Sequence, residues 1–121
     1  MPYIVGPTTP SHLNMSAGIV QSGIKTTEAT GANNLVSLTA ADYQSVDYQI
    51  QVVRGSSYNS GLIKVIHDGT NAYMTEYGTL NQPAGIATFS SQINLGNIEL
   101  LGYPGTASTT IFKVIYSAVK T

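Results

Sequence analysis

The stretch that most constrains the fold is GLIKVIHDGTNAYMTEYGT, residues 61–79, in which two strand-like runs flank a polar turn. The turn begins with Asp68-Gly69, a strong hairpin signal because Gly adopts the positive φ that such turns require. β-favouring apolar residues dominate the run before the turn, and the run after it shows a period of two. The sequence therefore predicts an antiparallel hairpin in which residues 62–67 pair with residues 72–77.

Short strand-like segments continue along the chain and are separated by turn signals at regular spacing, while no helical period extends beyond one turn. Besides the two strands of the hairpin, the candidates are residues 17–27, 35–38, 48–54, 86–95, 97–103 and 109–119. This pattern predicts an all-β, single-domain β-sandwich of about eight strands, with jelly-roll and immunoglobulin-like topologies both open.

Two segments near the middle and the end of the chain carry more specific predictions. Residues 54–61, RGSSYNSG, are rich in Gly and Ser and predict a loop that leads into the hairpin. Residues 109–119 are largely apolar at both alternating sets of positions. They predict a central strand that is covered on both of its faces.

The first 15 residues, MPYIVGPTTPSHLNM, hold three of the five prolines and sustain no period. Because Pro fixes φ and lacks an amide proton, we expect an extended N-terminal arm over residues 1–15, followed by the sandwich domain over residues 16–121. Fixing an arm requires compensating burial. The expected anchors, which we predict to contact another chain, are its apolar residues Tyr3, Ile4, Val5 and Leu13.

Charge is scarce in this chain. Charged residues are 9% of the sequence, against roughly 25% in typical globular proteins. The net charge of −1 offers no electrostatic footprint for nucleic acid or for an anionic membrane. No apolar run approaches the length of a membrane span, and the N-terminus lacks a secretory signal, so we expect the protein to be made and used in a cytoplasm, or released from one. So few charges favour a homo-oligomer over a lone soluble monomer.

Catalytic and metal-binding patterns find little support. His67 and Glu76 on opposite strands of the hairpin could form a base or a metal-ligand pair, but a structural role for His67 at a strand end is favoured. The remaining acidic residues are scattered, and the sequence has no Cys. We therefore predict no catalytic residues, no cofactor and no metal, and a protein that is not an enzyme.

The abundance of tyrosine is the most informative anomaly of the composition. The chain has eight Tyr, two Phe and no Trp. Tyr73 and Tyr77 fall on one face of a predicted strand, where they could form an aromatic contact ridge. Tyr serves both in interfaces and in sandwich cores, and the sequence leaves both roles open. We name Tyr73 and Tyr77 as candidate interface residues.

Three segments of the chain together form a recognisable pattern: DYQIQVVRGSS at 47–57, KVIHDGTNAYMTEYGT at 64–79 and GNIELLGYPGTASTTIFKVI at 96–115. These segments resemble a β-rich module of virion structural proteins of tailed bacteriophages, especially marine and cyanobacterial ones. The resemblance covers roughly residues 45–118, and HDGT and TEYG are its most specific elements. It implies a non-catalytic module at the end of a longer fibre or surface protein. The short segment ahead of the module favours instead a small protein attached to a capsid.

These observations lead to a first hypothesis of a virion structural protein on the capsid surface. It would be a decoration or cement protein that stabilises the phage head by bridging neighbouring subunits, with the major capsid protein or another virion protein as its partner. The alternative is a receptor- or carbohydrate-binding protein of a tail fibre or appendage. An exposed aromatic platform beside Asn and Asp side chains would favour this alternative.

Overall fold

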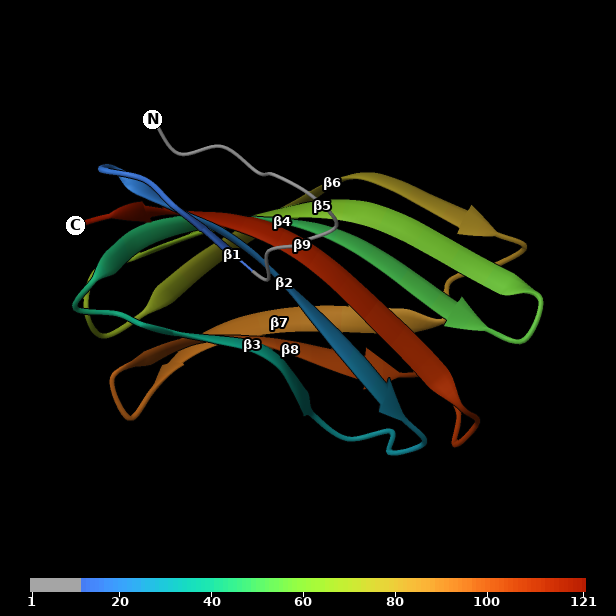
Figure 1. Ribbon diagram of the computed structural model, residues 1–121. Coiled ribbons are helices and arrows are strands. Elements are labelled where there is room, and N and C mark those ends of the chain that lie inside the picture. Colours follow the sequence, from blue (N-terminus) through green and yellow to red (C-terminus); the bar gives the residue numbers. More distant parts are fainter. Residues whose placement is uncertain (1–11) are drawn as a thin grey trace.

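The computed structural model describes residues 12–121, which form nine antiparallel strands and no helix. The strands lie in two layers that face each other, as Figure 1 shows. They are β1 (His12–Asn14), β2 (Gly18–Thr27), β3 (Asn33–Thr39), β4 (Tyr43–Arg54), β5 (Ser57–His67), β6 (Ala72–Gln82), β7 (Ala87–Asn94), β8 (Asn97–Pro104) and β9 (Thr110–Lys120). The all-β sandwich that the sequence predicts is confirmed.

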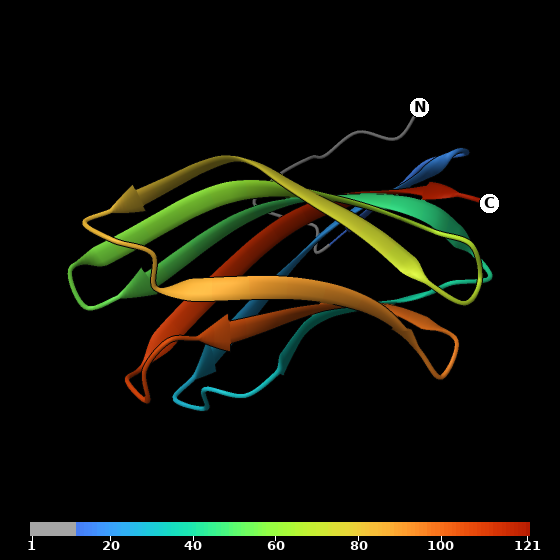
Figure 2. The ribbon, with the colours of Figure 1, turned by 180° about the vertical axis from the view of Figure 1, so that it is seen from behind.

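The two sheets differ in size. The larger has six strands in the order β1-β2-β9-β4-β5-β6, and the smaller has three in the order β3-β8-β7. Seen from behind in Figure 2, β6 and β7 run along the same side of the sandwich, one in each sheet. This division differs from the four-plus-three arrangement of an immunoglobulin constant domain. Within residues 12–121, no helix is long and apolar enough to span a membrane.

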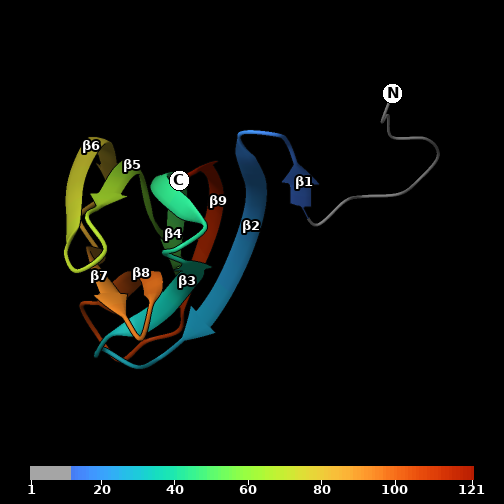
Figure 3. The same ribbon diagram turned by 90° about the vertical axis from the view of Figure 1, so that its left-hand side faces the viewer.

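The ninth strand arises from the segment that the sequence assigns to the arm. β1 pairs with β2, so that Leu13 lies opposite Val20, and Figure 3 shows it at the outer edge of the larger sheet. Residues 12–14 are thus part of the sandwich's own sheet. Tyr3, Ile4 and Val5 lie outside the described residues, and their contact with another chain stays a prediction.

The central hairpin is confirmed in the predicted register. Leu62 pairs with Tyr77 and His67 with Ala72, and Gly69 has a φ of +94°. The Asp68 side chain closes the turn, because its Oδ1 accepts hydrogen bonds from the backbone N–H groups of Asn71 at 2.8 Å and Thr70 at 3.0 Å. These two bonds, with a third from the Tyr73 hydroxyl, hold the pKa of the Asp68 carboxyl below its usual range.

The predicted loop at residues 54–61 is wrong. β4 and β5 are joined by the two-residue turn Gly55-Ser56, with Gly55 at a φ of +58°, and β5 begins at Ser57. A two-residue turn of this kind directly continues the antiparallel ladder. The backbone of this polar stretch is paired on both sides, to β4 and to β6, so its strand geometry does not depend on apolar side chains.

The core lies between the inward faces of the two sheets. It is built from alternating positions of β4, β5, β8 and β9, and Phe112 at its centre is fully buried. Strand β9 is central, as predicted, since it pairs with both β2 and β4. The prediction that both of its faces are covered is wrong, because Ile115 on the opposite face is 55% exposed. The smaller sheet covers only one face of the larger one.

Two tyrosines in the core differ in how their hydroxyl groups are satisfied. The rings of Tyr48 and Tyr116 lie 5.8 Å apart. The Tyr116 hydroxyl donates to Gln21 Oε1 at 2.7 Å, whereas the buried Tyr48 hydroxyl has no hydrogen-bond partner among residues 12–121. Burial, together with the nearby Tyr116, raises the pKa of the Tyr48 hydroxyl well above its usual range.

This difference predicts opposite effects for two matched substitutions. Tyr48→Phe removes an unsatisfied buried hydroxyl and should raise the free energy of unfolding by about 1 kcal/mol, whereas Tyr116→Phe breaks a hydrogen bond and should lower it by about 1 kcal/mol. Urea unfolding followed by far-UV circular dichroism measures both. A Tyr48→Phe variant that is less stable than Tyr116→Phe would contradict the assignment.

Candidate binding site between the two sheets

A cavity of about 280 Å³ opens at the side of the sandwich where β6 and β7 face each other. These two strands are the edges of their respective sheets and are not hydrogen-bonded to each other. Side chains of β4 and β5 reach the cavity from the larger sheet, and the connection between β6 and β7 lies at one end of it. The cavity therefore sits where the two layers of the sandwich part.

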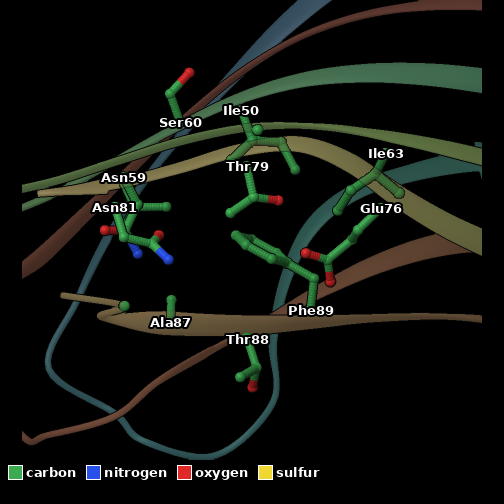
Figure 4. A pocket seen from close by; sticks show the side chains of 13 residues that line it. Ile50, Asn59, Ser60, Ile63, Glu76, Thr79, Asn81, Ala87, Thr88 and Phe89 are labelled. Atoms are coloured by element: carbon green, nitrogen blue, oxygen red, sulfur yellow. The ribbon is translucent and has the colours of Figure 1, made fainter.

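Apolar side chains form the inner wall of the cavity. Ile50, Val52 and Ile63 are buried core residues of β4 and β5 that also line it. The Phe89 ring projects from β7 into the space between the sheets, as Figure 4 shows. An edge-to-face contact with Phe112, with ring centroids 6.0 Å apart, fixes this ring. The cavity thus offers an ordered aromatic surface to a ligand.

Two polar side chains of β6 converge on this aromatic ring. In Figure 4 the Glu76 carboxylate and the Thr79 hydroxyl point into the cavity, whereas Ser60 and Thr88 point away from it. Glu76 faces inward because it pairs with the buried Ile63. Within residues 12–121 its carboxylate makes no hydrogen bond or ion pair, and the described Lys–carboxylate pair joins Lys64 to Asp47 on the opposite face. Glu76 is free to accept hydrogen bonds from a ligand.

A buried asparagine lies at the end of the cavity beside the β6–β7 connection. Asn59 of β5 is 7% exposed. In the amide orientation that satisfies both of its ends, it donates to the Ala84 carbonyl at 3.0 Å and accepts from the Ile86 N–H at 2.8 Å. These bonds tie the β6–β7 connection to β5 and fix the width of this end.

His67 and Glu76 are not brought together. His67 pairs with Ala72, whereas Glu76 lies four residues further along β6, about 13 Å away at the rise of a strand. Both ring nitrogens of the buried His67 are occupied, since Nδ1 accepts from the Gly69 N–H at 2.9 Å and Nε2 lies 2.6 Å from the Tyr43 carbonyl. The structural role that the sequence favours for His67 is confirmed.

A buried carboxylate in the smaller sheet also has a structural role. Glu99 of β8 is 8% exposed and accepts hydrogen bonds from Gln92 Nε2 at 2.9 Å, and from Asn34 and Asn94 at 3.4 Å. Its partners come from β7, from β3 and from the end of β7, so that Glu99 fastens the strands of the smaller sheet. In the described part of the chain, no three His, Cys, Asp or Glu side chains are grouped to hold a metal ion.

The predicted interface residues that the structure describes lie on a different surface from the cavity. Tyr73 and Tyr77 are 54% and 45% exposed on the outer face of β6, opposite to Glu76. The Tyr73 hydroxyl donates to Asp68 Oδ2 at 2.9 Å, which orients its ring beside an Asp side chain. Leu13 is 50% exposed on the same outer face, at the far edge of the sheet. Their binding of a partner stays a prediction.

The comparisons find likeness only at the level of fold. No family model matches the chain, and no curated protein matches its sequence. The tailspike protein of Acinetobacter phage vB_ApiP_P1 is similar over 100% of this chain and 24% of its own, with a TM-score of 0.51 and 16% identity. The tailspike protein of Acinetobacter baumannii phage AM24 is similar over 84% of this chain and 26% of its own, with a TM-score of 0.48 and 8% identity. The chain therefore spans about a quarter of the length of these proteins.

Proposed function

We propose that this chain is a virion structural protein, a receptor-binding β-sandwich module of a bacteriophage tail appendage that holds a saccharide in the cavity between β6 and β7. The observation that carries this proposal is the convergence of an aromatic ring, a free carboxylate and a hydroxyl in one cavity. The fold likeness of the whole chain to a segment of a phage tailspike protein supports the location.

The chemistry of the cavity suits a hydroxylated ring. The face of Phe89 can pack against the C–H face of a pyranose, while the two oxygens of Glu76 accept hydrogen bonds from neighbouring hydroxyl groups. The Thr79 hydroxyl can donate to or accept from a third. A volume of about 280 Å³ lies just below the range for drug-sized ligands, roughly 300–1,000 Å³. We assign it to one sugar unit, with the remainder of a glycan leaving through the open edge.

Tail location is the alternative hypothesis of the sequence analysis, and the comparisons favour it over capsid decoration. The structural neighbour that is similar over the whole chain is named as a tailspike protein. Binding also gives the inter-sheet cavity a role that a purely cementing protein would not require. The proposal assigns the chain no catalytic step.

The saccharide site predicts a specific loss of binding. The isolated chain is titrated with a panel of hexoses, N-acetylhexosamines and their disaccharides. At least one of them should shift the amide resonances of residues around Glu76 and Phe89 in ¹H–¹⁵N correlation spectra. Glu76→Gln should lower the affinity for that sugar at least tenfold, because hydrogen bonds to a charged group contribute about 1.5–3 kcal/mol.

The matched control for this experiment is Asp42→Asn, which removes an exposed carboxylate from the turn between β3 and β4. It should leave affinity unchanged. The site is refuted if no member of the panel shifts the cavity amides, or if Glu76→Gln binds as the wild type does.

The tail location predicts where the chain is found on a particle. Antibodies raised against the purified chain, detected with gold in electron micrographs of phage particles that carry it, should label the tail appendages. Particles from a phage whose copy of the coding sequence is deleted serve as the control. Gold distributed around the head would contradict the proposal and return capsid decoration as the function.

A further inference from the structure

The outer face of the six-stranded sheet is unusually apolar for a surface. Ten of the twelve large hydrophobic residues that are exposed in residues 13–121 project from this one face. They are Leu13, Ile24, Tyr58, Leu62, Ile66, Tyr73, Tyr77, Leu80, Ile115 and Val119. Such a concentration marks an interaction surface, because monomeric proteins rarely expose large contiguous apolar patches.

From this face we infer that the chain self-associates, and that a second copy packs face to face on the outer side of the six-stranded sheet. The inference concerns a surface that the saccharide site does not use. Because Glu76 and Tyr77 are neighbours on a strand, their side chains point to opposite faces. A dimer built in this way leaves the cavity open.

The centre of the face is an apolar row that crosses the sheet. Ile115 of β9, Leu62 of β5 and Tyr77 of β6 lie in line across the strands, with Gln49 of β4 between the first two. A hollow of about 250 Å³ borders these side chains and is also lined by Asp47 and Ser117. A raised apolar side chain on the facing copy can fill it, as side chains interdigitate between packed sheets.

The charges on this face are compatible with a copy of itself. Lys64 and Asp47 lie side by side in the row next to the central one, with Nζ and Oδ1 3.0 Å apart. A two-fold axis along the central row would place Asp47 opposite Gln51, Lys64 opposite Ser60, and Lys113, the other charged residue of these rows, opposite Ser117. None of these three charges would then meet its like, which is what an isologous interface requires.

The size of the face matches a stable interface. The five long strands of the larger sheet, β2, β9, β4, β5 and β6, span about 24 Å at a spacing of about 4.8 Å. Ten residues of strand extend about 33 Å. The projected area is therefore about 800 Å², which equals the area of about 800 Å² that each partner buries in a standard interface. One further copy is sufficient to cover the face.

The test is the molar mass of the isolated chain in solution. Size-exclusion chromatography with light scattering should give twice the 12.8 kDa of one chain. Ile115→Glu places a charge in the central row and should weaken the dimer at least tenfold. Tyr77→Gln, at the other end of that row, should weaken it in the same direction. Circular dichroism checks that both variants remain folded.

The matched control is Leu95→Glu. Leu95 is 93% exposed in the turn between β7 and β8, away from the outer face of the larger sheet, so the dimer should be unaffected. If the wild-type chain is still a monomer at about 1 mM, the free energy of dimerisation is weaker than about 4 kcal/mol. This result overturns the inference and indicates a different protein as the partner of the face. A trimer, or a dimer that Ile115→Glu and Tyr77→Gln leave intact, overturns it equally.

Discussion

The pairing of β9 with both β2 and β4 determines which side chains enter the core and which face outward. Because successive residues of a strand alternate between faces, the register that buries Phe112 and Val114 also exposes Ile115. The smaller sheet covers the inner face alone. The fold therefore consists of one sandwich core and one apolar face that has no cover in the described chain.

The edge strand β6 connects the two proposals. Its register with β5 directs Tyr73 and Tyr77 to the outer face and Glu76 to the cavity between the sheets. One strand thus contributes to a packing surface on one side and to a ligand site on the other. In such an arrangement, association through the outer face and binding at the β6–β7 edge are geometrically independent. The two proposals can therefore be tested separately.

Local patterns predict the parts of this fold that depend on neighbouring residues. The Asp68-Gly69 turn fixes the register of the central hairpin, and the apolar alternation of residues 109–119 places β9 at the centre of its sheet. The β5 segment that begins at Ser57 escapes prediction because its strand geometry comes from pairing with β4 and β6. The apolar outer positions of β9 predict a second covering layer, because the sequence alone does not distinguish a covered face from one that is free to bind.

The cavity depends on contacts that no local pattern encodes. Phe89 and Glu76 belong to different sheets, and they meet only because β6 and β7 form the edges of the sandwich on the same side. From the sequence, Glu76 is a candidate only as the partner of His67. The register of β5 and β6 places these two residues about 13 Å apart. The local sequence signal for the polar end of the cavity is Asn59, a polar residue inside what proves to be strand β5.

The central claim is that the outer face of the six-stranded sheet is a contact surface and not simply exposed. Since the chain contains no Cys, a single cysteine can report on each surface without interference. Ile115→Cys and Leu95→Cys are each treated with a maleimide, both in dilute isolated chain and in assembled particles. The account predicts that the thiol at position 115 becomes protected on assembly while the thiol at position 95 stays reactive. Equal labelling at both positions in the assembled particle would contradict it.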